Sequence, residues 1–236
     1  MNNFNIGRQS FTNLFWETIF INGTPICNLV ENQLSSKHKE IESLRKLAAY
    51  NTGSMSLASS LSLSLITYYF NPKIIVEIGT FIGRSTYSIA LGSSLTQSQL
   101  EKIHTCDFSN DIPLNFDPVL DMVQQYPKTS STEMLKQLQN RGIKPDFYFI
   151  DGRLTDEDLL LMESIDARSS IILMDDFEGT EKGVINSLKV TDHFKNNFML
   201  SYSPPQYLLD KIGINDRSSL AVLVPASKIS YVKQMF

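Results

Sequence analysis

The chain has 236 residues, of which 42% are apolar and 19% are charged, and its formal net charge is −4. This length suits one α/β domain with an added segment and allows a sizeable buried core. Nucleic acid is disfavoured as the main partner, because phosphate binding needs a basic footprint and the sequence has no long run of Lys and Arg.

The two cysteines and the apolar stretches indicate a cytoplasmic protein without a membrane partner. Cys27 and Cys106 are far apart and lack the spacing of a metal site, so we expect both to be reduced. Residues 1–5 do not have the basic-then-apolar build of a signal peptide. The longest apolar stretch, residues 57–70, is too short and too rich in serine to span a bilayer.

The first 50 residues are predicted to form helices outside the α/β core. Apolar residues within 11–19 fall at helical spacing, the Asn-Gly-Thr-Pro segment 22–25 interrupts the pattern, and a second helix is predicted over residues 41–47. We expect residues 1–50 to form a helical cap on a domain of residues 51–236. A lid over a substrate pocket, or an arm that forms a homodimer, is the more specific alternative.

Residues 51–72 are predicted to form a loop and a capped helix. The loop of residues 51–56 offers an N-cap, and the helix follows over residues 57–69. Pro72 ends this helix, because proline disfavours a helical conformation in the residue before it.

Residues 74–86 predict a buried strand, a tight turn and the start of a helix. An apolar run that includes Glu77 is followed by Gly79 and Gly83, and then by a helical segment led by Ser85. Gly79 takes backbone angles that other residues avoid, and Gly83 lets the helix approach its neighbour without a Cβ in the way. The N–H groups at the helix start then face a ligand on the loop.

The spacing of this motif indicates the kind of ligand. A dinucleotide fold has the pattern G-x-G-x-x-G, whereas the pattern here is E-x-G-x-x-x-G. A carboxylate at the end of the strand would repel phosphate but suits a ligand that carries an ammonium group. The spacing therefore argues against the first rival function, an NAD-dependent oxidoreductase.

A second strand is predicted over residues 102–108. Asp107 lies at its end, 24 residues past the second glycine of the motif, where one carboxylate can accept both ribose hydroxyls of an adenosine ligand. His104 inside the strand is expected to be structural. Residues 109–128 are predicted as loop and helix, and residues 130–133 form a capping box that starts the next helix.

Two further strands bring three carboxylates to one edge of the predicted sheet. Residues 145–150 precede Asp151, and residues 170–174 precede Asp175 and Asp176. This is the edge at which α/β sheets bind ligands. Three carboxylates without a nearby cation would raise one another's pKa values, and a divalent cation such as Mg²⁺ or Mn²⁺ resolves the repulsion. Alternatively, they are the strand-end acids of a metal-free protein.

The motif around Gly79 resembles motif I of the class I S-adenosylmethionine-dependent methyltransferases. The acids after the fourth and fifth strands resemble those of metal-dependent O-methyltransferases of the catechol and caffeoyl-CoA type. The run Asp175-Asp176-Phe177 is closer to the macrocin-type enzymes, which act on macrolide sugars. The resemblance covers residues from about 50 to 190.

The resemblance implies a Rossmann-like α/β fold. Its sheet is doubly wound, seven-stranded and mostly parallel, with an antiparallel last strand, and the N-terminal helical cap is added to it. Residues 198–202 and 220–224 fit a late antiparallel hairpin at the sheet edge. They are joined by a loop over residues 203–219, which is long enough to shape a pocket.

The resemblance also implies that the cofactor, S-adenosylmethionine, lies over the motif loop. Glu77 would face its amino-acid end, and Ser131 would touch the adenine edge. The implied cofactor-binding residues are Gly53, Met55, Glu77, Gly79, Thr80, Phe81, Gly83, Ser85, Asp107, Phe108, Ser131 and Asp151.

The implied activity is methyl transfer from S-adenosylmethionine to a hydroxyl of a small molecule. A metal held by Asp151, Asp175 and Asp176 would bind the acceptor oxygen as Lewis acid and template. Asp151 would double as the general base. Arg153 is a candidate contact for an anionic group of the substrate.

One departure from the resemblance leaves the identity of the general base, and of the substrate, undecided. Catechol-type enzymes place a lysine just after the first metal-binding Asp, whereas Asp151 is followed by Gly-Arg-Leu-Thr. Three alternatives stay open as well: a metal-free class I methyltransferase, a non-catalytic nucleoside-binding member of the fold, and methylation of nucleic acid. The acidic charge weakens the last of these.

Overall fold

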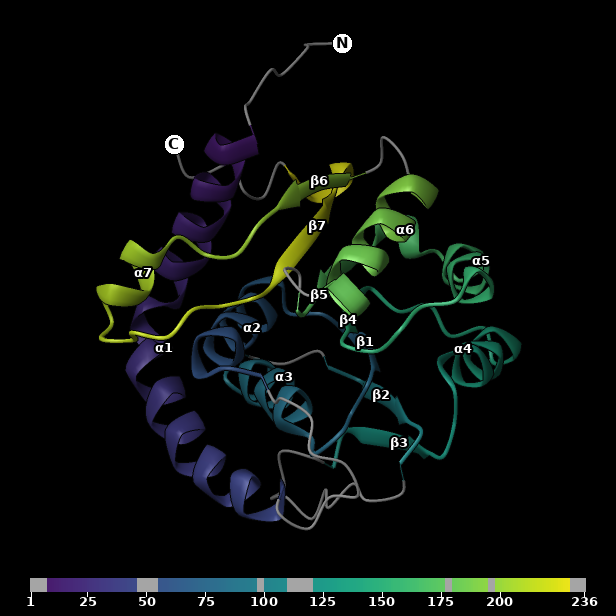
Figure 1. Cartoon of the computed structure of the whole chain (residues 1–236), viewed down its shortest axis with the longest axis horizontal. Coiled ribbons are helices and arrows are strands. Elements are labelled where there is room, and N and C mark those ends of the chain that lie inside the picture. Colours follow the sequence, from purple (N-terminus) through teal and green to yellow (C-terminus); the bar gives the residue numbers. More distant parts are fainter. Residues whose placement is uncertain are drawn as a thin grey trace.

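A central sheet of seven strands, in the order β3-β2-β1-β4-β5-β7-β6, organises the chain (Figure 1). The computed structural model describes residues 8–45, 55–96, 100–109, 121–176, 180–194 and 198–229. The first five strands pair in parallel, and β7 runs antiparallel to both β5 and β6. This confirms the predicted fold class. The strands are β1 (Ile74–Ile78), β2 (Lys102–Asp107), β3 (Val123–Pro127), β4 (Phe147–Ile150), β5 (Ile171–Met174), β6 (Phe198–Ser201) and β7 (Ala221–Pro225).

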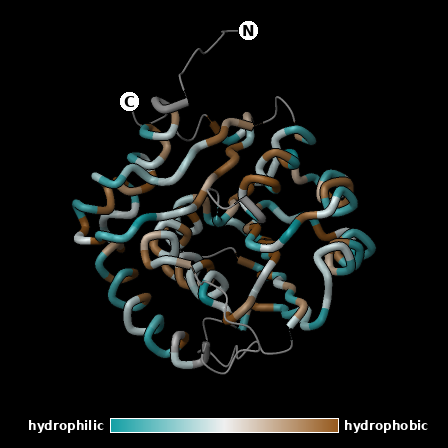
Figure 2. The backbone as a smooth tube through the Cα atoms, viewed as in Figure 1, coloured by the Kyte–Doolittle hydropathy of each residue, from teal (hydrophilic) through white to brown (hydrophobic). Residues whose placement is uncertain are grey.

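Helices cover both faces of the sheet. In the described residues, α1 to α3 pack in one hydrophobic cluster with the sheet, and residues of α4 to α6 pack in a second cluster on the other face. Hydrophobic residues run through the strands, whereas the outer turns of α1 carry hydrophilic ones (Figure 2). The helices are α1 (Arg8–Arg45), α2 (Leu57–Phe70), α3 (Arg84–Ser94), α4 (Ser131–Asn140), α5 (Asp156–Ser164), α6 (Ile185–His193) and α7 (Gln206–Asp210).

Strand β4 shows why the parallel strands read as continuous apolar runs. Phe147 and Phe149 belong to the cluster of α1 to α3, and Tyr148 and Ile150 belong to the opposite cluster. Successive side chains of a strand point to opposite faces, so a strand covered on both faces must be apolar throughout. The carboxyl ends of such strands are the places where polar side chains can reach a cleft.

The N-terminal segment forms one continuous helix, so the predicted break at residues 22–25 is wrong. Pro25 lies inside α1. A proline in a helix interior removes a backbone hydrogen bond and costs about 3 kcal/mol. Burial offsets this cost, because Phe15, Ile19 and Leu34 are fully buried along one side of α1. The division at residue 50, and the role of this helix as a lid or dimer arm, stay predictions.

The third strand was not predicted from the sequence, and this is a second correction. Residues 109–128 were expected to be loop and helix, but Val123–Pro127 forms β3, which pairs in parallel with β2. Gln124 is exposed on this edge strand, so the segment lacks the apolar run of the central strands. Residues 110–120 lie outside the described residues.

Several local predictions are confirmed. Ser56 caps α2 by accepting a hydrogen bond from the Ser59 N–H, and Asn71 ends this helix in the left-handed conformation. The capping box of α4 forms between Ser130 and Glu133. His104 is buried, with Nδ1 3.1 Å from the Tyr126 hydroxyl.

Two remaining expectations concern the long loop and the membrane. The loop predicted over residues 203–219 contains a short helix, α7. Among the helices that the structure describes, none combines the length and the apolar character needed to cross a membrane.

Helices α2 and α3 approach one another closely at Gly92 of α3. A Cβ at this position would lie 2.2 Å from the carbonyl oxygen of Ser64 in α2. Gly83 caps the N-terminus of α3 with a φ of 78°, and its predicted role in close helix approach stays a prediction.

We expect Gly92→Ala to destabilise the protein by about 3 kcal/mol, because the methyl group would push two backbones apart. In an unhindered helix the same change stabilises by up to about 1 kcal/mol. The sign of the change in unfolding free energy therefore tells whether a Cβ at position 92 meets the backbone of α2. Urea unfolding measures it, with Ser94→Ala on the exposed side of the same helix as the control. A gain in stability for Gly92→Ala would contradict this packing.

Candidate active site

A cleft of about 390 Å³ lies at the carboxyl ends of β1, β2 and β4. Its volume falls in the range of about 300–1,000 Å³ that is typical of small-molecule sites. Thr129, Arg153 and Lys182 form part of its wall. Six of the residues predicted to bind the cofactor also line it: Gly79, Phe81, Asp107, Phe108, Ser131 and Asp151.

The loop after β1 has an unusual backbone that fits it closely to the end of β4. Gly79 has a φ of 96°, and a Cβ there would lie 3.0 Å from the backbone of Asp151 and Gly152. Phe81 has a φ of 46°, which is strained for a bulky residue. Its N–H donates a 2.8 Å hydrogen bond to Asp107 Oδ2, which holds the strained turn in place.

Asp107 joins this loop to the end of β2. Its Oδ1 accepts a 2.7 Å hydrogen bond from the Ser109 N–H, so both carboxylate oxygens are oriented by backbone donors. Phe108, the next residue, is 78% exposed although it is aromatic, and it lines the same cleft.

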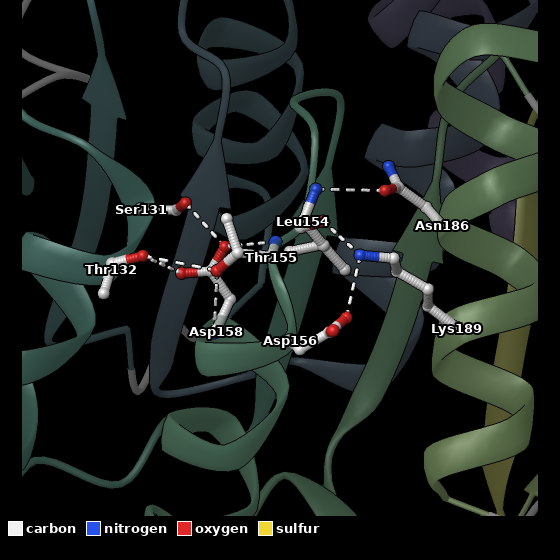
Figure 3. A network of polar contacts seen from close by, with 8 residues as sticks. All are labelled: Ser131, Thr132, Leu154, Thr155, Asp156, Asp158, Asn186 and Lys189. Atoms are coloured by element: carbon white, nitrogen blue, oxygen red, sulfur yellow. Dashed lines mark hydrogen bonds and ion pairs between the residues drawn. The ribbon is translucent and has the colours of Figure 1, made fainter.

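The far wall of the cleft is fixed by Asp158 of α5, which is fully buried (Figure 3). Ser131 Oγ donates to Asp158 Oδ2 at 2.9 Å, and Thr132 Oγ1 donates to Oδ1 at 2.6 Å. The Thr155 N–H donates to Oδ2 at 2.8 Å. One carboxylate thus ties the N-terminus of α4, where Ser131 faces the cleft, to the N-terminus of α5.

The segment that follows Asp151 is held from the other side by α6 (Figure 3). Asn186 Oδ1 accepts from the Leu154 N–H at 3.0 Å, and its Nδ2 donates to the Gly152 carbonyl at 2.8 Å. Lys189 donates to the Leu154 carbonyl at 3.2 Å and pairs with Asp156 at 2.9 Å. These contacts fix the backbone that carries Arg153.

Glu77 is completely buried and lies outside the lining of the cleft. Thr86 and Thr105 both donate hydrogen bonds to its Oε2, and no described residue hydrogen-bonds to Oε1. Burial raises the pKa of Glu77 to about 7, although the hydroxyls of Ser85, Thr105 and Thr86 oppose the shift.

The other predicted residues support the loop from behind or lie apart from the lining. The hydroxyl of Thr80 is 2.5 Å from that of Thr105. The carbonyl of Met55 accepts a hydrogen bond from Arg84. Ser85 is buried in the first turn of α3. Gly53 lies outside the described residues.

The acids after β4 and β5 do come together, but they surround a lysine that sequence reasoning missed. Lys182 Nζ is 2.7 Å from Asp151 Oδ1 and 3.1 Å from Asp176 Oδ2. It also donates to the Asp151 carbonyl at 3.2 Å. The third acid, Asp175, accepts a hydrogen bond at Oδ1 from Ser219.

The lysine changes the electrostatics of the cluster. Burial raises the pKa of Asp151, and the charge of Asp175 adds to the shift, while Lys182 opposes it. Burial also raises the pKa of Asp175. For Lys182, burial lowers the pKa, but the charges of Asp151 and Asp176 outweigh this, so the net shift is upward. The ammonium therefore stays charged and favours the ionised form of Asp151.

The sequence signal for Lys182 is its place six residues after Asp176, in the π-helical turn η3 (Thr180–Val184) that returns to the sheet edge. The resemblance predicts a lysine directly after Asp151, where none occurs.

Comparison with known proteins supports the fold. No family model and no curated protein matches the chain. The O-methyltransferase from Bacillus cereus, solved in complex with SAH, matches 80% of this chain and 90% of its own, with a TM-score of 0.56 and 19% identity. The O-methyltransferase TomG from Streptomyces achromogenes, involved in Tomaymycin synthesis and solved with SAM, matches 83% and 89%, with a TM-score of 0.55 and 14% identity.

A third structure, the cofactor-bound protein Rv0187 from MTB, matches 79% of this chain and 88% of its own, with a TM-score of 0.55 and 15% identity. At these identities the likeness shows the fold. The chain thus has the Rossmann-like fold of the class I methyltransferases, with the strand order given above.

We expect the buried Glu77 to make stability depend on pH. The neutral form favours folding, so its contribution is complete below the unfolded pKa of about 4.5 and is lost as pH rises through about 7. Relative to wild type, Glu77→Gln should gain stability over this range, by about 3 kcal/mol at its upper end.

Urea unfolding at a series of pH values measures this difference. Glu133→Gln is the control, because hydrogen bonds from Ser130 lower the pKa of Glu133 and the pH trend has the opposite sign. If Glu77→Gln and wild type keep a constant difference across the range, Glu77 is not the titrating group.

Proposed function

We propose that the protein transfers the methyl group of S-adenosylmethionine to a hydroxyl of a small molecule. The observation that carries this proposal is the cleft, in which the strained loop after β1, Asp107 and Asp151 share one wall. It lies at the carboxyl edge of parallel strands, where this fold class binds ligands. The B. cereus and S. achromogenes enzymes of the same fold were solved with SAH and SAM.

The cofactor assignment follows the wall of the cleft. Asp107 would accept the ribose hydroxyls on its two carboxylate oxygens, and Phe108 would cover the adenine with its exposed ring. Ser131 would lie at the adenine edge, and the loop with Gly79 would hold the methionine half. Direct contacts of Met55, Glu77, Thr80, Gly83 and Ser85 with the cofactor stay predictions.

The proposed chemistry requires alignment and removal of one proton. The acceptor oxygen forms a bond to the methyl carbon while the carbon–sulfur bond breaks, and the electron pair remains on sulfur. The hydroxyl proton passes to Asp151, the general base, whose pKa is raised by burial and so lies closer to neutral pH. Holding oxygen and methyl carbon in line is the larger contribution. Arg153 would contact an anionic group of the acceptor.

A divalent cation does not fit the acid cluster as it is built. The two oxygens best placed to share a cation, Asp151 Oδ1 and Asp176 Oδ2, both bind the ammonium of Lys182. Among the residues that the structure describes, no three His, Cys, Asp or Glu side chains are arranged to hold a metal ion. The predicted metal site is therefore not part of the proposal, and of the alternatives raised by the sequence the metal-free one is favoured.

We expect Asp107→Ala to raise the Kd for S-adenosylmethionine at least about tenfold, equivalent to about 1.4 kcal/mol, because two ribose hydrogen bonds are lost. Isothermal titration calorimetry measures the affinity. Asp121→Ala, which removes an exposed acid outside the cleft, is the control. Unchanged affinity in Asp107→Ala would show that the ribose acceptor is elsewhere.

We expect Asp151→Asn to slow methyl transfer by about 10²-fold or more at saturating S-adenosylmethionine, because the base is lost. Formation of S-adenosylhomocysteine with a panel of phenolic, sugar and carboxylate acceptors measures the transfer. A wild-type protein that binds the cofactor but turns over no acceptor would instead be a non-catalytic member of the fold.

A further inference from the structure

The acid cluster already contains its own cation. Lys182 is carried to the sheet edge by η3, and its Nζ contacts the acids at the ends of two neighbouring strands, Asp151 after β4 and Asp176 after β5. The side chain of Lys182 is 36% exposed, and it lines the cleft. The ammonium therefore lies between the cluster and the space that the substrates would enter.

The ammonium and a metal ion exclude one another at this position. A Mg²⁺ ion needs oxygen ligands at about 2.0–2.1 Å in octahedral geometry. Asp151 Oδ1 and Asp176 Oδ2 are 2.7 Å and 3.1 Å from Lys182 Nζ, so a cation that bound both would compete with the ammonium for these oxygens and be repelled by its charge. The remaining acid is also engaged, since Asp175 Oδ1 accepts from Ser219.

We propose that Lys182 is the resident cation of this site, replacing a divalent metal and positioning Asp151 for methyl transfer. This inference rests on the proposed function for its catalytic part, whereas its structural part concerns the cluster alone. Lys182 acts as a positioning residue: it ties η3 to the ends of β4 and β5 and keeps its proton throughout.

The contacts of Asp151 leave one of its carboxylate oxygens to accept the proton of the acceptor hydroxyl. Its Oδ1 is bound to Lys182, and no described residue donates to Oδ2. The acceptor hydroxyl gives its proton to Oδ2 as the new O–CH₃ bond forms and the S–CH₃ bond breaks. The products are the methylated acceptor and S-adenosylhomocysteine, with the proton on Asp151, so the step needs no further reactant.

The exchange of metal for ammonium also changes which acceptors the site can take. A divalent ion can bind two adjacent oxygens of one acceptor, as in a diol. The three N–H groups of Lys182 face three protein oxygens, the carboxylate and carbonyl of Asp151 and the carboxylate of Asp176. The acceptor therefore does not need two vicinal hydroxyls, and its selection falls to other groups of the wall, such as Arg153.

Manganese binding tests the structural part without any knowledge of the acceptor. Mn²⁺ is titrated into the full-length protein and followed by the loss of the free-ion signal in electron paramagnetic resonance. Wild type should show no stoichiometric uptake. Lys182→Ala removes the ammonium and leaves three carboxylates, so it should bind Mn²⁺ at least about tenfold more tightly than wild type.

Two further variants test whether the gain in Mn²⁺ affinity comes from the freed acids of this cluster. Lys136→Ala removes an equal charge from an exposed ion pair with Glu157 and should gain nothing. Lys182→Ala combined with Asp176→Asn should lose the gain, because one of the freed ligands is gone. Lys182→Gln, which keeps a polar side chain of similar length without the charge, takes the place of Lys182→Ala if that variant does not fold.

Three results would overturn the proposal: one equivalent of Mn²⁺ bound by wild type, wild-type methyl transfer that EDTA abolishes, or a folded Lys182→Ala with no gain in Mn²⁺ affinity. Calorimetry with S-adenosylmethionine on the same samples separates the two claims. A wild type that binds no cofactor refutes the proposed function, while the manganese titration still decides whether Lys182 holds the cation position.

Discussion

The contact between the loop after β1 and the end of β4 is the constraint on which the cleft depends. Gly79 brings the backbone of this loop so close to Asp151 and Gly152 that a Cβ would lie 3.0 Å from them. Two parts of the site, far apart in sequence, therefore become one wall. Phe81 accepts an unfavourable φ to complete the turn, and its N–H bond to Asp107 joins the end of β2 to the same wall.

Desolvation raises the pKa of two acids at this edge, and different partners oppose the shift. Glu77 is buried behind the loop with hydroxyl partners only, so burial dominates and favours the neutral carboxyl. Asp151 is also desolvated, but Lys182 lies 2.7 Å from it and opposes the shift. Burial outweighs both kinds of partner, so the pKa of each acid is raised to about 7. The two acids differ in position, because Glu77 lies behind the loop whereas Asp151 lines the cleft.

The parts of the fold that could be predicted are those determined by local pattern. The apolar runs of β1, β4 and β5, the capping box at Ser130 and the acids at the strand ends depend on neighbouring residues, and the structure has them where the sequence indicated. The failures involve contacts between distant segments. Helix α1 continues past Pro25 because its apolar side is buried against the rest of the protein. Strand β3 lies at the sheet edge and is defined by its pairing with β2. Lys182 reaches Asp151 only because a turn of the chain returns to the sheet edge.

Lys182 lies outside the strands and still contacts the acids at the ends of two of them. The structures that match the chain share only 14–19% of its residues, yet they match over about four fifths of its length. The ends of β4 and β5 lie side by side, so the acids that follow them raise one another's pKa values, and nearby positive charge opposes this shift. A turn that follows β5 lies beside these ends, and a single side chain from it can supply the charge. In this chain that side chain is Lys182, which contacts both Asp151 and Asp176.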